Sequence, residues 1–295
     1  MVDLAGGEWL EANRALWDER VPLHVGSEFY DQSALRSGAG HLYPIEEDEL
    51  AVLFPEGFAG KRVLHLQCHF GADTLVLAQR GATVVGIDFS KPAVLAARAL
   101  AEEVGLADSS RFVHANVYDA RHVLPEPESF DVVFTTWGTI GWLPDVAEWA
   151  RIVAWFLKPG GRLYFADGHP SAFVFDGDTG PDGMPAFRFP YDTDGVADVL
   201  DETGDYADPE ATLVSTRAWE WMHPLSETLT ALIDAGLTLD FVHEHYEHPS
   251  KMFPILVPAR PGLYGWPDKK WLPLGVSLAA TRVERVERVE TAPAG

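Results

Sequence analysis

Short runs of β-branched residues alternate with amphipathic segments between residues 60 and 168. This alternation is typical of strand–helix units around a parallel sheet. Strands are predicted at 62–66, 83–88, 111–115, 130–135 and 162–166, and helices over 72–80, 90–104 and from 145 onward. The last helix carries apolar residues at the i, i+3, i+4 and i+7 spacing of a helix that packs on a sheet.

The pattern changes on both sides of this region. Residues 171–212 contain 11 acidic residues, one arginine and many glycines and prolines. We interpret this segment as an acidic surface insertion or lid, and a solvated loop without function fits its composition equally well. Order returns with a helix near 225–233 and strands at 237–246 and 274–281. The pattern therefore predicts an N-terminal helical cap (1–57), a main domain (58–282) that contains the insertion, and a disordered tail (283–295).

Composition narrows the function. The formal charge of −23 would repel a phosphate backbone, so nucleic acid is not expected as a partner, although the charge also suits general solubility. The single cysteine, Cys68, allows neither an intrachain disulfide nor a multi-cysteine metal site. No apolar run of 18 residues occurs, and the N-terminus lacks a basic region, so we expect a cytoplasmic protein that does not bind membranes.

The first two strands end in residues suited to binding a nucleoside. After the first strand, a turn with Gln67, His69 and Gly71 leads into a helix, whose free N–H groups can bind a carboxylate. The second strand ends in Asp88, whose carboxylate can accept both hydroxyls of a ribose. The alternative is that Asp88 only caps the turn to Ser90.

The next two strands end at the same expected edge of the sheet. The third leads into Asn116 and Val117, where an amide side chain and a backbone N–H can bind the edge of an adenine. The fourth leads into Thr136 and Trp137, near the expected position of a reacting group. Four such strand ends at one edge predict a nucleoside site more strongly than any one alone.

Several stretches carry a family resemblance: residues 64–74, 85–90, 130–133, 142–145, 158–161 and 219–236. On these, the chain resembles the class I S-adenosylmethionine-dependent methyltransferases. It is most similar to an uncharacterised bacterial branch with Leu-Gln-Cys-His-Phe-Gly in place of the common Asp-x-Gly-x-Gly-x-Gly turn. The similarity extends over most of residues 17–282.

The resemblance implies an α/β, Rossmann-like three-layer sandwich with a seven-stranded, mostly parallel sheet and an antiparallel last strand. It implies S-adenosylmethionine as cofactor and S-adenosylhomocysteine as product. Where relatives carry an acid and two glycines, this chain has His65, Gln67 and His69, so Gln67 and His69 are expected either to bind the methionine carboxylate or amine or to pack the turn. The cofactor residues expected are Tyr30, Gln67, His69, Gly71, Thr74, Asp88, Phe89, Asn116, Val117, Thr136 and Trp137.

Methyl transfer from a sulfonium is an in-line displacement that needs alignment, exclusion of water and, for some acceptors, removal of one proton. His169, just after the fifth strand, and His24 are the candidate bases, with a loop hydrogen bond as the alternative for His169. His243, His245 and His248 alternate as metal ligands can, but no carboxylates follow the fourth strand, and no metal is expected.

Five tryptophans suggest an aromatic pocket for a small-molecule acceptor, although most tryptophans are core residues: Trp137, Trp142, Trp219, Trp221 and Trp266. Two other functions stay open. One is an NAD(P)-dependent oxidoreductase, disfavoured because the first turn has a single glycine. The other is a protein that binds S-adenosylmethionine without catalysis. The acceptor atom (O, N or C) and assembly as a homodimer are left open.

Overall fold

One seven-stranded sheet forms the centre of the molecule. The computed structural model describes residues 2–180, 184–208 and 210–283. The strand order is β10-β14-β5-β4-β1-β2-β3. The strands are β1 (Arg62–Leu66), β2 (Thr83–Asp88), β3 (Ser110–His114), β4 (Phe130–Thr136), β5 (Leu157–Gly168), β10 (Leu237–His245) and β14 (Gly275–Arg282). β14 runs antiparallel to both neighbours, and β1 to β5 are parallel. The predicted fold class is confirmed.

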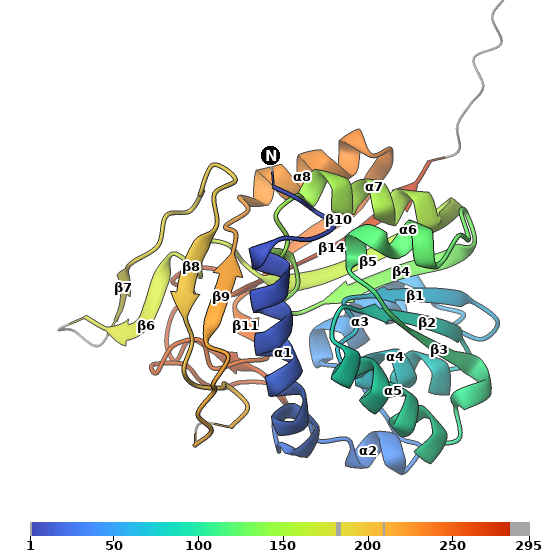
Figure 1. Cartoon of the computed structure of the whole chain (residues 1–295), viewed down its shortest axis with the longest axis horizontal. Helices are drawn as coiled ribbons and strands as arrows, with labels where there is room; N and C mark the ends of the chain where they lie inside the picture. Colours follow the sequence, from blue (N-terminus) through green and yellow to red (C-terminus); the bar gives the residue numbers. More distant parts are fainter. Residues whose placement is uncertain (1, 181–183, 209, 284–295) are drawn as a thin grey trace, which may run out of the picture.

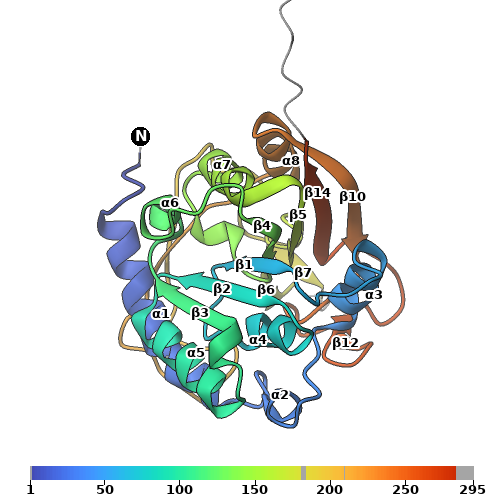
Figure 2. The same ribbon diagram turned by 90° about the vertical axis from the view of Figure 1, so that its right-hand side faces the viewer.

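Alternate side chains of the strands enter two cores on opposite faces of the sheet. Val63 and Val84 pack with α4 (Ala72–Gln79) and α5 (Lys91–Glu103). Leu64 and Val85 pack with α7 (Val146–Phe156) and α8 (Leu225–Asp234). Figures 1 and 2 show α4 and α5 on one side of the sheet and α6 (Ala120–Val123), α7 and α8 on the other. Two buried faces explain why the strands read as nearly continuous apolar runs.

Two boundaries differ from the prediction. The sequence Lys158-Pro159-Gly160-Gly161, which precedes the predicted fifth strand (162–166), lies inside β5, where pairing with β4 shifts register between Phe130 and Val132. An irregular pairing accommodates Gly160, whose φ is 75°. The small sheet of β11 (Glu247–His248), β13 (Tyr264–Gly265) and β12 (Val257–Pro258) was not predicted. Its strands are too short to give a periodic pattern.

The N-terminal segment and the acidic segment pack together at one end of the sheet. The first contains α1 (Glu8–Gly26), α2 (Ser33–Arg36) and α3 (Pro44–Leu53). The second contains the hairpins β6 (Phe175–Thr179) with β7 (Pro185–Phe187), and β8 (Asp198–Asp201) with β9 (Arg217–Glu220). β9 lies along α1 (Figure 1). The amide side chain of Asn13 donates to Trp219 O at 2.8 Å and accepts from Trp219 N at 2.8 Å. The acidic segment therefore packs against the body of the molecule.

The remaining boundaries stay predictions. The expected tail falls, from residue 284 on, outside the described residues. Among the helices of the described residues, none combines the length and apolar character needed to cross a bilayer. The division into cap, main domain and insertion also stays a prediction from the sequence pattern.

Close packing around residue 71 requires a glycine there. Its φ is 77°, and a Cβ added there would lie 2.5 Å from Phe112 Cε1 and 3.0 Å from Ala97 Cβ. The first turn thus approaches β3 and α5 as closely as a backbone can.

We expect Gly71→Ala to lower the free energy of unfolding by about 3 kcal/mol, because it adds a steric clash to the strain of a positive φ. Gly105→Ala is the matched control, since its φ is 71° and its surroundings are open. It should cost only about 1 kcal/mol. Urea unfolding of both variants gives the two values, and equal losses would show that the contact with Phe112 is unimportant.

Candidate functional site

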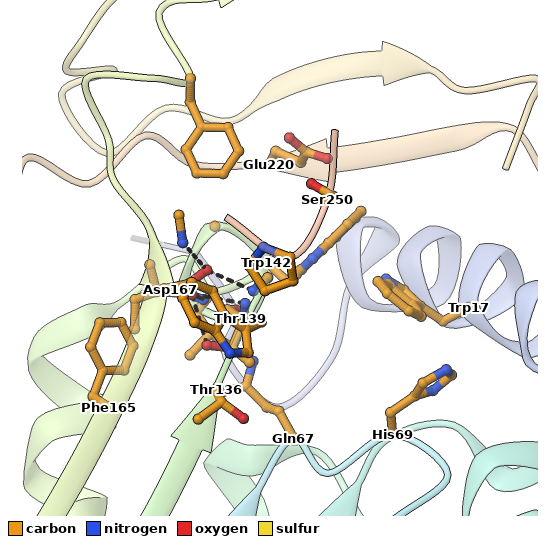
Figure 3. Close-up of a pocket in the computed structure, with 18 of the residues that line it drawn as sticks. Trp17, Gln67, His69, Thr136, Thr139, Trp142, Phe165, Asp167, Glu220 and Ser250 are labelled. Carbon is orange, nitrogen blue, oxygen red and sulfur yellow. Dashed lines mark hydrogen bonds between the residues drawn. The ribbon is translucent and has the colours of Figure 1, made fainter. Parts of the chain in front are cut away.

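A cavity of about 660 Å³ lies at the carboxyl ends of β1 to β5, a size common for small-molecule sites (Figure 3). Most of the residues expected at a cofactor line it: Tyr30, Gln67, His69, Asp88, Phe89, Asn116, Val117, Thr136 and Trp137. The fold therefore brings the four predicted strand ends together at one site, as parallel strands of one sheet require.

Four expected site residues do not line this cavity. They are Gly71, discussed above, Thr74, His24 and His169. Thr74 is buried, and its Oγ1 lies 2.8 Å from His65 Nδ1. His169 faces away from the cavity lining: its Nδ1 lies 2.7 Å from Ser171 Oγ, and its Nε2 lies 3.4 Å from a carboxylate oxygen of Glu244. The loop hydrogen bond considered as its alternative is thus present.

The first turn has an unusual backbone. Gln67 and His69 have φ values of 58° and 51°, in the left-handed region that glycine adopts at least cost. The side chain of Gln67 donates from Nε2 to Thr139 O at 2.8 Å, while its Oε1 is buried without a partner among the described residues. The turn thus offers the cavity a hydrogen-bond acceptor where a glycine would offer only backbone.

Asp88 fixes this turn from the neighbouring strand. Its Oδ2 accepts from His69 N, and its Oδ1 accepts from Ser90 N, both at 2.8 Å. The cap considered as the alternative is therefore present, together with a second bond to the first turn. Burial raises the pKa of Asp88 to about 6. Each oxygen keeps capacity for one more hydrogen bond from a ligand.

Asn116 is engaged within the protein. Its Nδ2 donates to Leu4 O at 2.7 Å, and its Oδ1 accepts from Tyr118 N at 3.3 Å. An adenine edge would therefore have to compete with Leu4 O of the N-terminal segment for the amide of Asn116. The backbone N–H of Val117, by contrast, has no acceptor in the part of the chain that the structure describes.

Sequence reasoning missed Asp167, which organises the loop after β4. Its carboxylate accepts from Gly138 N at 2.6 Å, Thr139 N and Thr139 Oγ1 at 2.9 Å, and Ile140 N at 3.0 Å (Figure 3). Acceptance of several N–H groups by one buried carboxylate holds a loop rigidly. The one feature of the sequence that could have pointed to Asp167 is its position as an acid at the end of an otherwise apolar strand.

A chain of hydrogen bonds joins three segments distant in sequence. His69 Nε2 lies 2.9 Å from His24 Nδ1, and His24 Nε2 lies 2.9 Å from Asp205 Oδ2. Burial alone would raise the pKa of Asp205, but the hydrogen bond and charge of His24, the N–H of Ala207 and the charge of Arg20 together lower the pKa below its usual value. Burial lowers the pKa of His69 well below its usual value. His24, a candidate base, therefore reaches the cavity only through His69.

The opposite wall of the cavity is mainly aromatic. It includes Trp9, Trp17, Trp142, Trp221, Phe29, Phe173 and Phe253, with the carboxyls of Glu202 and Glu220. Trp137, Trp142 and Trp221 contribute to it as expected. Trp219 and Trp266 lie outside the lining, and Trp266 Nε1 donates to Leu272 O at 2.9 Å.

Two of the alternating histidines share partners, and the third is separate. His243 Nδ1 lies 2.8 Å from Glu49 Oε1, and His245 Nε2 lies 2.7 Å from Ser277 Oγ, which donates to the same Glu49 oxygen at 2.8 Å. His248 Nδ1 accepts from Ser250 N at 3.0 Å. His243 and His245 thus belong to one hydrogen-bond group around Glu49, and His248 belongs to another.

Comparison by sequence finds a methyltransferase domain in part of the chain. Residues 64–165 match the family described as a methyltransferase domain. The ubiquinone biosynthesis O-methyltransferase of Stutzerimonas stutzeri (strain A1501) is 36% identical over 119 residues, which are 40% of this chain and 49% of that protein. The protein of the same name from Ralstonia nicotianae is 38% identical over 117 residues, 40% of this chain and 47% of its own length. The chain thus spans about half the length of the curated relatives it matches.

Solved structures share the fold. An S-adenosylmethionine-dependent methyltransferase from Mesorhizobium loti superposes with a TM-score of 0.55 at 22% identity, over 81% of this chain and 99% of that one. Geranyl diphosphate C-methyltransferase from Streptomyces coelicolor A3(2), in complex with Mg²⁺, geranyl diphosphate and S-adenosyl-L-homocysteine, gives 0.54 at 15% identity, over 95% and 99%. Together with the sequence matches, they confirm the resemblance to class I S-adenosylmethionine-dependent methyltransferases.

The buried ring of His65 predicts a pH dependence of stability. Burial lowers its pKa to about 3, whereas in the unfolded chain it takes up a proton near pH 6.5. The unfolded state therefore gains protons as the pH falls below 6.5, and stability decreases by about 1.4 kcal/mol per pH unit from this residue. His65→Asn should remove this contribution, so its profile should converge on that of the wild type between pH 6.5 and 5. Parallel profiles in urea unfolding would contradict the assignment.

The chain from Asp205 to His69 predicts a stability loss. Asp205→Ala should lower the free energy of unfolding by about 2–4 kcal/mol, because it leaves the buried His24 and Arg20 without their shared carboxylate. It should also speed amide hydrogen exchange over 198–220. Asp192→Ala, an exposed residue of the same segment, should change stability by less than about 0.5 kcal/mol. Equal behaviour of the two variants would refute the role given to Asp205.

Proposed function

We propose that this chain, which has the fold of the class I S-adenosylmethionine-dependent methyltransferases and a methyltransferase domain at residues 64–165, transfers the methyl group of S-adenosylmethionine to a small molecule. The observation that carries the proposal is the position of Asp88. It ends β2 in the cavity wall, is nearly fully buried, and keeps acceptor capacity on both oxygens. A carboxylate at this strand end is suited to the two hydroxyls of a ribose.

The first turn supports a role at the amino acid end of the cofactor. Gln67, whose Oε1 is buried without a partner among the described residues, and the partly buried Asp73 both line the cavity. Both are acceptors, so they suit the ammonium of the methionine moiety better than its carboxylate. Of the two alternatives for Gln67, the amine is therefore the one we propose. His69 lies beside them and is held by His24.

The proposed adenine site is formed by Val117 and Phe89. The N–H of Val117 has no acceptor among the described residues, and Phe89 lines the same cavity. Asn116 contributes by holding Leu4 and Tyr118, which fixes the backbone around Val117. Tyr30, which is stacked on His24 with ring centroids 4.9 Å apart, closes this region from the N-terminal segment.

S-adenosylmethionine, when bound, supplies an activated methyl group with a neutral thioether as leaving group. The residues of the chain then have to align the acceptor and exclude water. Asp167 holds the loop after β4, including Thr139 and Ile140, as a rigid floor beside Thr136 and Trp137. Neither His24 nor His169 lines the cavity, so we assign His24 to positioning of His69 and give His169 no part in the reaction.

The aromatic wall favours catalysis over simple binding of the cofactor. The cavity extends beyond the residues proposed for the cofactor to Phe173, Glu220 and Phe253. A protein that only senses the cofactor has no need of this space. Together with the charge of −23, it favours a small, uncharged or cationic acceptor over nucleic acid.

The relatives do not decide the acceptor atom. The two curated relatives are O-methyltransferases by name, but the matched methyltransferase domain ends at residue 165. Phe173, Glu202, Glu220 and Phe253 follow that point in the sequence. Acceptor choice therefore depends on a wall that the family match does not cover.

A dinucleotide is the rival ligand, and one experiment separates the two. Isothermal titration should show tight binding of S-adenosylhomocysteine to the wild type and none of NADH, because the one glycine of the turn faces Phe112. Asp88→Asn should weaken binding of S-adenosylhomocysteine by about 10- to 100-fold through loss of charge-assisted hydrogen bonds. Asp108→Asn, at an exposed site, should have no effect. Binding of NADH alone would overturn the proposal.

A further inference from the structure

The charges in the cavity wall are unbalanced. Among the described lining residues, Asp73, Asp88, Asp167, Glu202 and Glu220 are acidic, and Arg20 is the only arginine or lysine. Such a wall disfavours an anionic acceptor and favours a cation. Arg20 also has acidic partners of its own, so its charge is not available to neutralise the other acids of the wall.

Arg20 is already paired. Its guanidinium forms a short contact with Glu202 through Nη2, and its Nε lies 3.4 Å from Asp205 Oδ2. On the acceptor side, Asp167 is satisfied by the loop after β4. Glu220 is different: in the part of the chain that the structure describes, no ion pair with arginine, lysine or histidine forms at its carboxyl, and the side chain within hydrogen-bonding reach is another acid, Glu202.

The backbone fixes Glu220 in place from both sides. Trp219, before it, exchanges two hydrogen bonds with the side chain of Asn13. Trp221, after it, donates from its N–H to Gly141 O at 2.8 Å, and its ring meets that of Trp9 edge to face at 5.6 Å. Since Gly141 belongs to the loop that Asp167 organises, Glu220 is anchored to the floor beside which we place the methyl group.

Figure 3 shows where this carboxyl lies. In this view, Glu220 is drawn on one side of Trp142, and Gln67 and His69 are drawn on the other. The proposed cofactor residues and Glu220 thus stand on opposite walls, with aromatic rings between them. An acceptor bound between these walls would reach the cofactor with one end and Glu220 with its polar group.

The pKa of Glu220 is consistent with a site for a cation. Burial, and then the nearby charge of Glu202, raise its pKa to about 8. A bound ammonium would favour the ionised carboxyl, and a carboxyl with a pKa near neutrality is suited to exchange a proton with an amine.

We propose that Glu220 binds the protonated amino group of an amine acceptor and removes one proton from it before methyl transfer. The proposal rests on the proposed function. The ammonium N–H bond breaks and its proton passes to the Glu220 carboxylate, which leaves a nitrogen lone pair. The lone pair forms the new N–CH₃ bond as the bond from methyl carbon to sulfur breaks, and its electron pair stays on sulfur.

The surrounding rings support an amine over a phenol. Trp9, Trp142 and Trp221 line the space next to Glu220, and the faces of tryptophan rings attract cations. A phenol would gain nothing from this attraction, and its phenolate would be repelled by Glu202 and Glu220.

The test uses three probes of one shape and different charge: 2-phenylethylamine, 2-phenylethanol and 3-phenylpropionate. Each is titrated by calorimetry into protein saturated with S-adenosylhomocysteine, after binding of the latter has been measured. The amine should bind at least about tenfold more tightly than the alcohol, and the carboxylate should not bind. Glu220→Gln should reduce the affinity for the amine by about tenfold and leave that for the alcohol unchanged. With S-adenosylmethionine, the wild type should yield the N-methylated amine by mass spectrometry.

Glu210→Gln is the control, since Glu210 is exposed in the same acidic segment. It should behave as the wild type, and thermal unfolding of both variants checks that they fold. Equal affinity for amine and alcohol, no binding of the amine, or an unchanged amine affinity in Glu220→Gln would each overturn the role of Glu220. If these occur while S-adenosylhomocysteine binds, the proposed function stands without it. If S-adenosylhomocysteine fails to bind, the proposed function falls first.

Discussion

The buried carboxylate of Asp205 holds together the parts that form the cavity. It comes from the acidic segment, His24 comes from α1, and His69 comes from the first turn after β1. All three are packed away from bulk solvent or against the cavity, where an unpaired carboxylate or imidazole would be costly. The three side chains avoid this cost by forming hydrogen bonds with one another. The acidic segment is thereby docked on the methyltransferase domain, and its Glu202 and Tyr206 become part of the wall.

The same turn has a strained backbone. Gln67 and His69 adopt the left-handed conformation, which glycine would adopt with less strain. The strain is balanced by fixed contacts: Gln67 to Thr139 O, His69 N to Asp88, and His69 to His24. Each contact also joins the turn to another wall of the cavity. The site is therefore more tightly connected than one built on bare backbone.

Much of this was predictable from the sequence. The strands, the capping of α5 by Ser90 and the meeting of four strand ends follow from local periodicity and sheet geometry. Asp205 and Asp167 were not predicted as site residues, because their roles arise from contacts with residues 181 and 27 positions away. Glu220 was not predicted either, because it is placed by Asn13, which holds the neighbouring Trp219 from 206 positions away. His169 illustrates the converse: its place after β5 favoured the cavity, but its ring turns to Ser171 and Glu244. Side-chain direction in an irregular loop leaves no periodic signal.

The most direct measurement is a crystal structure of the protein with S-adenosylhomocysteine. The account predicts that both ribose hydroxyls donate to Asp88, that the ammonium contacts Gln67 Oε1, and that the sulfur faces the aromatic wall next to Trp142 and Glu220. A ligand bound with its ribose away from Asp88, or bound outside this cavity altogether, would contradict it.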